Sequence, residues 1–541
     1  MLMNVDVVIA GAGAAGLSAA IELGRRGINV VILECLDKDD YRGPRTYLIN
    51  SRSMEHLRRW GIADRLAERN PIDPEMQPDV IFATRLNGYL LHRFDRPFVG
   101  TERVEEAAEN AQWIPQRSIE ETMIELVNTM PTVKLLWRHA LVSFTEVEDG
   151  VSCVATDPDG KEFEISGKYL VGADGSKSLV RKSLGIRLQG RGNMLAAFVY
   201  HVRVPELKRI SKVGHSSFYW FVNGSYGGYS GVTINCVREG EYSIGSFPCP
   251  PGIDASDEAQ VRKVIYAGFG EETPMEFIGG RSYNMHAIIA PEMLRGRVAI
   301  AGDAAHLLPN LGGFGFNVGL LDGVDIGWKL AYLLKGWGGD RLLLSYQNER
   351  QEALNWVAKI QIENVDVLSH DIYMPGLEDD TPEGERLRQR AKEIIVREKT
   401  QEFHSLGTQK GYRLTKSEII SDDGSPPAPT DAIQYFQTSR PGSLAPHAWL
   451  TDGSSLYDHF GPEFTLVVRD GSAAEVDSTI AVDVPIKVLV LPDPAIAKLY
   501  DTRFTLVRPD QMVAWRGDEL PEDLAGLMAR LTGRAASAAT H

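Results

Sequence analysis

The chain has 541 residues, of which 43% are apolar and 24% charged, and its formal net charge is −16. This composition is typical of a globular protein of about two to four domains, and the acidic balance argues against a nucleic-acid partner, which is held by clustered Lys and Arg. No apolar run approaches the ~18 residues of a membrane span, and the four cysteines form no CxxC pair. We therefore expect a cytoplasmic protein with no metal site and no membrane partner.

The first 34 residues have the pattern of a dinucleotide-binding unit. A short apolar strand from Val5 to Ile9 leads into a glycine-rich turn, a helical pattern and a second apolar strand that ends at Glu34. In such a unit the glycines allow a tight turn, close approach of a pyrophosphate and close packing of the helix on the strand. The N-terminus of the helix attracts the phosphates. We predict that Glu34 binds an adenosine ribose and that the dinucleotide contacts Gly11, Gly13, Ala14, Ala15 and Gly16.

The segment from 35 to 186 carries weaker signals. Arg45 lies in a loop that could fold over the phosphates, although composition alone favours a solvated arginine. Gln116 precedes a helical pattern, and Asp-Gly turns at 149–150 and 159–160 predict a small antiparallel meander. Asp174 follows an apolar strand and precedes a helix, where it is either a turn or N-cap residue or a functional acid. The residues alone do not decide between these interpretations.

From about 187 to 290 the sequence changes to alternating, aromatic-rich strands. We predict a mainly antiparallel sheet that is inserted into the first domain. Its aromatic residues are candidates for a wall that faces a substrate, although most aromatics on such a sheet pack in the core.

A second glycine-rich helix start follows the buried strand at 297–301. Asp303 stands at the end of this strand, and the glycines at 312, 313 and 315 open a long apolar helix. Such a helix start sets backbone N–H groups against an electron-rich part of a cofactor. We interpret the neighbouring His306 as a structural hydrogen-bonding residue.

The remaining chain continues with helices as far as about 401. A linker rich in Asp, Ser and Pro lies at 421–430, and alternating strands and helices follow, including a helix predicted over 472–480. This pattern predicts a compact third domain of about a hundred residues.

The chain resembles the group A FAD-dependent aromatic hydroxylases, in the phenol hydroxylase-like subgroup with a C-terminal thioredoxin-like domain. The resemblance rests on Gly11–Gly16, Gly172–Ser176, Gly302–Asn317 and the C-terminal segments 440–449 and 504–516. It implies an α/β fold with a Rossmann-like FAD-binding domain in two parts, 1–186 and 291–420, the second part including a helical region. The inserted, mainly antiparallel substrate domain would span 187–290, a linker 421–440 and the thioredoxin-like domain 441–541.

The resemblance also implies the reaction and the site residues. NADPH or NADH would reduce FAD, and O2 would then form a flavin C4a-hydroperoxide that hydroxylates a phenolic or similarly activated ring. Arg45 and Gln116 would contact FAD, Asp174 would lie between cofactor binding and the approach of the reductant, and Asp303 would bind the ribityl chain. The pyrimidine edge of the flavin would face Pro309, Gly312, Gly313, Gly315, Phe316 and Asn317. A homodimer is plausible from the resemblance alone.

The base that deprotonates the substrate is left open, with His215, Tyr219 and His286 as candidates. Two departures from the family pattern argue against plain phenol as the substrate. Tyr47 stands where phenol hydroxylases place an acid, and Asn310 and Leu311 replace the second proline and the threonine of the family's Pro-Pro-Thr.

Two alternatives remain at this point. One is a flavin-dependent halogenase, although the Trp-x-Trp-x-Ile-Pro element of that class is incomplete before Ile114. The other is an FAD-binding regulator that has lost catalysis.

The region 441–541 contains no cysteine, which excludes disulfide exchange there.

Overall fold

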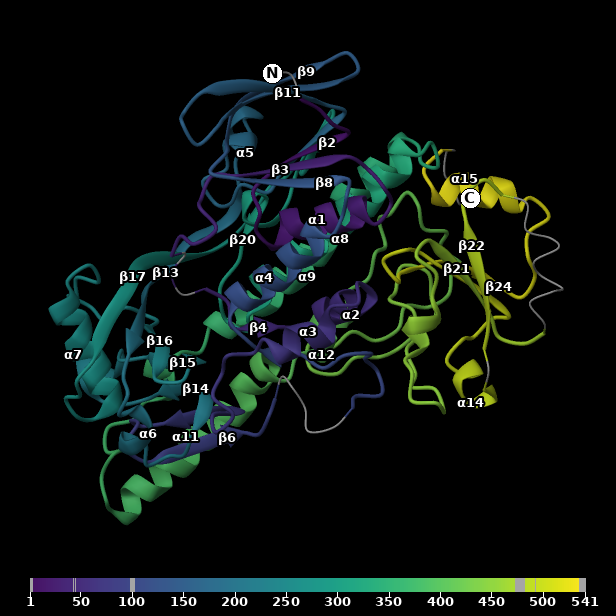
Figure 1. Cartoon of the computed structure of the whole chain (residues 1–541). Coiled ribbons are helices and arrows are strands. Elements are labelled where there is room, and N and C mark those ends of the chain that lie inside the picture. The colour runs from purple at the N-terminus through teal and green to yellow at the C-terminus, as the bar shows by residue number, and fades with distance from the viewer. Residues whose placement is uncertain are drawn as a thin grey trace.

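The computed structural model describes residues 3–41, 43, 45–97, 103–471, 482–491 and 493–534 (Figure 1). The helix predicted over 472–480 lies outside these residues. In the described part of the chain, none of the helices is both long and apolar enough to span a lipid bilayer.

A six-stranded, mostly parallel sheet forms the first domain. Its order is β18 (Leu294–Arg295), β19 (Val298–Ile300), β12 (Tyr169–Gly172), β2 (Val7–Ala10), β3 (Val30–Glu34) and β8 (Val133–Trp137), and only β18 runs antiparallel to its neighbour. β2 and β3 are fully buried, as continuous apolar strands of a parallel sheet should be. The strand–helix–strand unit predicted at the N-terminus is therefore confirmed, with α1 (Ala14–Gly24) between β2 and β3.

Further helices and small sheets surround this core. The predicted meander contains β9 (Ala140–Val147), β10 (Gly150–Thr156) and β11 (Glu162–Gly167), with β1 (Met3–Asn4) beside β11. β4 (Leu48–Ile49) pairs with β7 (Gln112–Trp113). The helices of this part and of the segment after the sheet domain are α2 (Ser51–Arg59), α3 (Ala63–Glu68), α4 (Gln116–Asn128), α5 (Leu179–Ser183), α8 (Phe314–Leu334), α9 (Asp340–Val365), α10 (Ser369–Ile372), α11 (Pro382–Phe403) and α12 (Leu406–Lys410).

The helices α1 and α8 cross with almost no space between their backbones. A Cβ atom added at Gly323 of α8 would lie 2.1 Å from the carbonyl oxygen of Ala15, and one at Gly327 would lie 2.9 Å from that of Ala19. Contacts this short cannot be made by real side chains. The glycines in the middle of α8 therefore let its backbone lie directly against that of α1.

We expect Gly323→Ala to destabilise the apoprotein by about 2 kcal/mol, because the helices must separate to admit one methyl group. Gly315→Ala on the same helix is the matched control, since a Cβ there meets nothing within 4 Å. It should stabilise the apoprotein by roughly 0.5–1 kcal/mol through helix propensity. Thermal unfolding of both apoproteins measures the difference, and equal shifts would contradict the close crossing.

The second domain is built on an eight-stranded sheet. Its order is β20 (His306–Leu307), β17 (Glu276–Ile289), β13 (Gln189–Arg203), β16 (Glu241–Ser246), β15 (Val232–Arg238), β14 (Ser216–Phe221), β5 (Gln77–Ala83) and β6 (Leu90–Phe94). β5 and β6 come from the N-terminal segment, outside the range 187–290, and only β14 and β5 pair in parallel. α6 (Leu207–Ile210) and α7 (Glu258–Phe269) contribute to the apolar cluster on one face.

The other face of this sheet packs against α11. We call its apolar cluster the α11-side cluster; its buried rings are those of Tyr47, Phe82, Phe94, Trp113, Phe218, Trp220, Phe247 and Phe403, and it also includes Leu48, Ala197, Met285 and Leu311. Alternation along β14 sends Phe218 and Trp220 to this cluster and Tyr219 and Phe221 to the opposite face. The α11-side cluster thus reaches the turn that precedes α8.

The C-terminal domain has a four-stranded mixed sheet. Its order is β22 (Ile486–Val490), β21 (Phe464–Val468), β23 (Phe504–Val507) and β24 (Val513–Gly517), and only β21 and β22 are parallel. α14 (Pro494–Ala497) and α15 (Leu524–Leu531) flank it. Figure 1 shows this domain (yellow) and the eight-stranded sheet on opposite sides of α1, α8 and α9. The structure confirms the predicted fold class: a Rossmann-like domain, an inserted and mainly antiparallel sheet, and a C-terminal α/β domain.

Candidate functional site

The first helix start leaves its backbone donors open. α1 begins after Gly13, which has no side-chain cap, and a Cβ added there would meet nothing within 4 Å. At Gly16, in contrast, a Cβ would lie 2.0 Å from the carbonyl oxygen of Gly11. Gly16 therefore serves packing, and the space beside Gly13 gives access to N–H groups that have no acceptor inside the helix. This is the arrangement that binds a pyrophosphate.

Glu34 lies against the same turn. Its carboxylate accepts a hydrogen bond from the Ala12 N–H at 2.8 Å and a second from the Leu36 N–H at 3.1 Å, and the residue is buried. The acid is thus placed at the end of β3, next to the glycine turn, where a ribose beside the pyrophosphate would lie.

The start of α8 also leaves its first backbone N–H groups accessible. α8 begins after Gly313, which has φ +68° and no side-chain cap, and the space beside Gly315 is empty to 4 Å. Gly302 (φ +61°) lies between the helices, since its Cβ would be 3.0 Å from the Cβ of Ala15 and 4.0 Å from the Cα of Gly319. The exposed Asp303 follows at once. The structure therefore brings both helix starts and Asp303 to one edge of the parallel sheet.

Two further predicted residues adjoin each other. The Gln116 N–H donates to the carbonyl oxygen of Thr46 at 2.9 Å, and the Thr46 N–H lies 3.4 Å from Oε1 of Gln116. Arg45, the residue before Thr46, is exposed. Arg45 and Gln116 are thus neighbours, although their positions in the sequence are 71 apart.

Asp174 lies five residues before α5 in the sequence, and its side chain faces the N-terminus of that helix. Its carboxylate accepts hydrogen bonds from Ser178 Oγ at 2.5 Å and from the N–H groups of Leu179 and Val180 at 2.7 and 3.1 Å. The end of β12 touches the first glycine turn, because a Cβ on Gly11 would lie 2.2 Å from the carbonyl oxygen of Ala173. Asp174 therefore binds the first N–H groups of α5, beside the N-cap Ser178, at the same sheet edge.

The turn from 309 to 313 is fixed from several sides. Gln361 of α9 donates to the carbonyl oxygens of Pro309 and Leu311. Asn317 Nδ2 donates to the carbonyl oxygen of Gly313 at 2.8 Å, and its Oδ1 accepts from the Asn50 N–H at 2.9 Å. Asn317 thus fixes the first turn of α8 through its side chain. Phe316 in the same turn is half-buried.

His306 is a buried hydrogen-bonding residue, as predicted. Its partner is Asp322 rather than Asp303: Nε2 lies 2.7 Å from Oδ2 of Asp322, which also accepts from the Gly302 N–H at 2.9 Å. Arg350 donates to the other carboxylate oxygen of Asp322 at 2.7 Å. Although burial raises the pKa of Asp322, His306 and Arg350 hold it below its usual range. The group anchors the strand end that carries Asp303.

The three candidate bases lie at three separate places. His215 Nε2 faces the carbonyl oxygen of Lys208 at 3.3 Å, and Tyr219 belongs to the cluster on the α7 face, where its hydroxyl donates to the carbonyl oxygen of Gly214 at 2.9 Å. His286 accepts from the Asn193 N–H at 3.1 Å, and strand alternation places it opposite Met285 of the α11-side cluster. The structure does not bring these side chains together or to the turn before α8.

Two tyrosines that were not predicted as site residues, Tyr47 and Tyr283, lie in or against the α11-side cluster. Tyr283 of β17 packs on the α11-side cluster, and its hydroxyl accepts a hydrogen bond from Asn310 Nδ2 at 2.9 Å. Tyr47 is a buried member of the same cluster, next to the pairing of β4 with β7. Burial raises the pKa of both hydroxyls, that of Tyr283 to about 12. Side chains alternate between the two faces of a strand, so Tyr283 lies on the same face as Met285, and this pattern could have identified it. Its partner Asn310 stands where the family pattern has a proline, so the sequence already marked that position as unusual.

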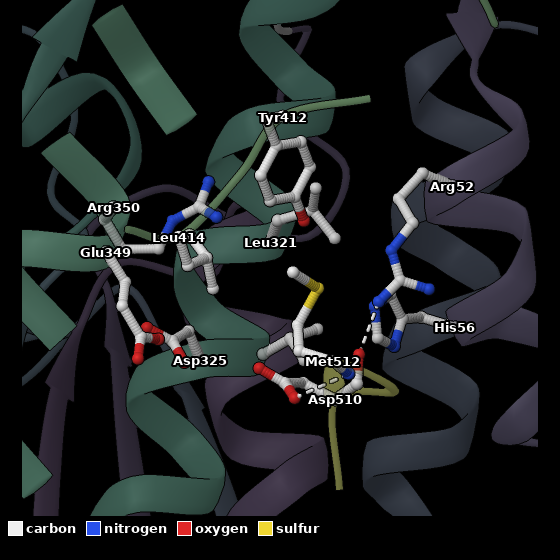
Figure 2. Close-up of a pocket in the computed structure, with 11 residues that line it drawn as sticks. Arg52, His56, Leu321, Asp325, Glu349, Arg350, Tyr412, Leu414, Asp510 and Met512 are labelled. Carbon is white, nitrogen blue, oxygen red and sulfur yellow. Dashed lines mark hydrogen bonds between the residues drawn. The ribbon is translucent and has the colours of Figure 1, made fainter. Parts of the chain in front are cut away.

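A second polar cluster joins the C-terminal domain to α8 and α9. A cavity of about 20 Å³ lies beside it. Figure 2 shows Asp325 and Glu349 together on one side of the cavity and Asp510 on a separate loop, which precedes β24. The three carboxylates lie close enough together to hold a metal ion. Lys329 Nζ, however, bonds Asp325 and Glu349 at 3.0 and 2.8 Å, and Arg508 bonds Glu349 and Asp510. Because these two cations already pair with the three carboxylates, the cluster is an ion-pair network.

The backbone N–H groups and carboxylates at this edge of the sheet fit FAD. Two uncapped helix starts with open space at Gly13 and Gly315 offer backbone N–H groups to a pyrophosphate and to a second electron-rich group. Glu34 offers a carboxylate for a ribose, and Asp303 an exposed carboxylate between the helix starts. A long cofactor with these groups in sequence would meet each of them in turn.

Comparisons with known proteins agree with this arrangement. Residues 4–359 match the FAD binding domain family, and residues 438–535 match the family of the aromatic-ring hydroxylase C-terminal domain. The aklavinone 12-hydroxylase RdmE of Streptomyces purpurascens is 30% identical, over 98% of this chain and 99% of its own. Phenol 2-monooxygenase of Pseudomonas sp. (strain EST1001) is 27% identical, over 96% and 91%. The structure of chromopyrrolic acid-soaked RebC with bound 7-carboxy-K252c has a TM-score of 0.88 and 29% identity, over 99% of this chain and 100% of its own.

Proposed function

Because the chain belongs to the FAD-dependent aromatic-ring hydroxylases, we propose that its own substrate is a phenolic ring that forms part of a larger flat ring system. Enzymes of this family are monooxygenases that use FAD, with NAD(P)H as the reductant and O2 as the oxidant. When bound, FAD supplies the oxygen activation. The chain itself must hold the cofactor, orient the ring and exclude water.

We assign the cofactor contacts to the two helix starts. The N–H groups around Gly13, Ala14 and Ala15 would bind the pyrophosphate, and Glu34 would bind the adenosine ribose. Arg45 and Gln116 would close over the cofactor from the neighbouring loop, and Asp303 would bind the ribityl chain. The first turn of α8, from Gly313 to Asn317, would face the flavin ring. Its positive end favours the negative charge of the reduced ring.

The substrate proposal rests on one observation: Tyr47, in place of an acid, is buried in the aromatic α11-side cluster. Tyr283, on the same side, is held by Asn310 at the turn before α8. Because burial keeps both hydroxyls neutral, they would bind a substrate oxygen by hydrogen bonds without removing its proton. These two tyrosines suit a ring whose hydroxyl is already acidic, such as one conjugated to a carbonyl group.

A substrate panel tests this proposal. We expect 1,8-dihydroxyanthraquinone to stimulate NADPH oxidation by the FAD-loaded enzyme at least about tenfold more than phenol does, which corresponds to ~1.4 kcal/mol. Tyr283→Phe should reduce that difference, while His286→Asn, on the opposite side of β17, should leave it unchanged. Equal stimulation by phenol would contradict the proposal. Adding halide to the same assay distinguishes a halogenase, and absence of turnover with every ring would indicate a regulator.

Two predictions from the sequence stay open in this account. Cys153, Cys236 and Cys249 form no disulfide, which supports a location in the reducing cytoplasm. A homodimer follows from the family resemblance, and light scattering of the FAD-loaded protein would measure it.

A further inference from the structure

The C-terminal segment 440–449 carries part of the family resemblance, but the function proposed above gives it no role. Two of its side chains bind backbone carbonyl groups more than 340 positions earlier in the sequence. His447 Nδ1 lies 2.8 Å from the carbonyl oxygen of Glu105. Trp449 Nε1 donates to the carbonyl oxygen of Val104 at 3.0 Å. We call these two side chains the clamp, because they hold a distant stretch of the chain against the C-terminal domain.

The ring of His447 is fixed through both of its nitrogens. The residue is 1% exposed, and its Nε2 lies 3.0 Å from Ser455 Oγ. Because a carbonyl oxygen can only accept, Nδ1 must carry the proton that binds Glu105, and Nε2 then accepts from the Ser455 hydroxyl. Burial lowers the pKa of His447 to about 4, so the ring is neutral at pH 7 and each nitrogen has one partner. His447 therefore holds the backbone at Glu105 in one position.

The stretch that the clamp holds, residues 103–109, contains no helix or strand. We call it the anchored segment, because side chains of the C-terminal domain, α12 and α2 surround its backbone. The remaining contacts are those of Arg103 with the Trp449 ring (4.2 Å to its centroid), of Lys410 Nζ with the carbonyl oxygen of Glu106 (2.7 Å) and of Ser51 Oγ with that of Glu109 (2.6 Å). Since the segment has no regular hydrogen bonding of its own, these side chains determine where it lies.

The anchored segment leads into β7 and so into the aromatic side of the candidate site. Trp113 of β7 belongs to the α11-side cluster, and its ring centroid lies 5.8 Å from that of Phe218. The same residue pairs with Leu48 of β4. The Leu48 carbonyl oxygen accepts a hydrogen bond from Asn317 Nδ2, in the first turn of α8, at 3.1 Å. Trp113 thus lies between the aromatic cluster and the helix start that we assign to the flavin.

We propose that His447 and Trp449 are positioning residues, through which the C-terminal domain fixes the anchored segment and keeps Trp113 in place beside the aromatic substrate. In coupled turnover one atom of O2 enters the ring and the other leaves as water, while NADPH is oxidised to NADP⁺. When the ring is poorly held, the same NADPH, a proton and O2 give NADP⁺ and hydrogen peroxide instead. The effect on turnover rests on the proposed function, whereas the clamp itself can be measured without a substrate.

Hydrogen–deuterium exchange of the FAD-loaded full chain measures the clamp directly. The amides at 108 and 114 donate hydrogen bonds of 3.1 and 2.8 Å, so their exchange reports whether the stretch 103–114 stays in place. We expect His447→Leu to speed exchange there by about tenfold while leaving β2 unchanged. His447→Asn should restore most of the protection, because its amide nitrogen can replace Nδ1 as the donor.

The ratio of hydroxylated product to NADPH oxidised measures the consequence for turnover, with 1,8-dihydroxyanthraquinone as the ring. We expect His447→Leu to lower this ratio by about threefold and to release hydrogen peroxide, at unchanged FAD affinity. His447→Asn should recover most of the ratio. His459→Leu is the matched control, because this second histidine of the C-terminal domain lies 2.9 Å from Ser454 Oγ and is not part of the clamp. It should change neither the exchange nor the ratio.

Trp449→Phe keeps the test available if His447→Leu fails to fold. It retains a ring beside Arg103 but removes the N–H that binds Val104, and we expect smaller effects in the same direction. Exchange over 103–114 within about twofold of the wild type would overturn the proposal, even if the melting temperature fell. Faster exchange with an unchanged product ratio would also overturn it, since the clamp would then be purely structural. If the wild type hydroxylated no ring, the proposed function would fail, and the exchange measurement alone would decide whether the clamp exists.

Discussion

Gly13→Val is expected to leave the apoprotein folded and to weaken FAD binding by roughly 100-fold, about 2.7 kcal/mol. Gly13 has φ −78° and ψ −179°, an extended conformation that valine adopts readily, and the space beside it is empty to 4 Å. The new side chain would fill the space through which a pyrophosphate reaches the start of α1. Titration of the apoprotein with FAD, followed by flavin fluorescence, measures the loss.

Two other glycines provide controls for this result. Gly16→Val should prevent folding, because its Cβ would meet the carbonyl oxygen of Gly11 at 2.0 Å. Gly27→Ala removes a glycine at φ +73°, where a Cβ meets nothing within 4 Å, so it should cost some stability but leave FAD affinity unchanged. If Gly13→Val bound FAD as tightly as the wild type, the pyrophosphate would have to lie elsewhere.

Arg508→Met is expected to destabilise the protein by about 3–5 kcal/mol. The Arg508 guanidinium is fully buried and bonds the carboxylates of Glu349 and Asp510, so its removal leaves the buried network one positive charge short. The network connects the C-terminal domain to α9, and we expect this junction to loosen first. Differential scanning calorimetry would show a lower or separate transition for the C-terminal domain.

The pH dependence of stability checks the same network. Although burial raises the pKa of Glu349, Arg508 and Lys329 hold it below the usual 4.5. A lowered pKa adds stability that is present above pH 4.5 and is lost as the pH falls further. Arg508→Met should therefore reduce the acid sensitivity of the transition below pH 4.5. Arg209→Ala, which removes an exposed ion pair with Glu206, should change stability by less than ~1 kcal/mol, and an equal effect of both variants would contradict the account.

The turns and helix starts of the candidate cofactor site could be predicted from the sequence because their signals are local. The turn from Gly11 to Gly16 and the acid Glu34 stand within one strand–helix–strand unit. The pattern of apolar residues along each strand and helix predicts where these residues lie in that unit. The second helix start at Gly313 was visible for the same reason. The close crossing of α1 and α8 was not visible, because it depends on small residues facing each other across more than 300 positions.

The substrate half could not be predicted in the same way. Whether a side chain on β14 or β17 faces α11 or α7 depends on strand register, and a shift of one residue exchanges the faces. Tyr219 was selected for its residue type, while its neighbours Phe218 and Trp220 face α11. The contact of Tyr283 with Asn310 joins β17 to the turn before α8, and the pairing of Arg508 with Glu349 spans 159 positions. Such long-range contacts leave no local signal.

We propose that this chain holds FAD between two helix starts and uses it to insert oxygen into an aromatic ring. The most direct measurement is turnover of the FAD-loaded protein with NADPH and a hydroxyanthraquinone under ¹⁸O2, followed by mass spectrometry of the product. We expect substrate-stimulated NADPH oxidation and a hydroxylated product that carries one atom of ¹⁸O. A product whose new oxygen comes from water, or NADPH oxidation that yields only hydrogen peroxide with every ring tested, would contradict it.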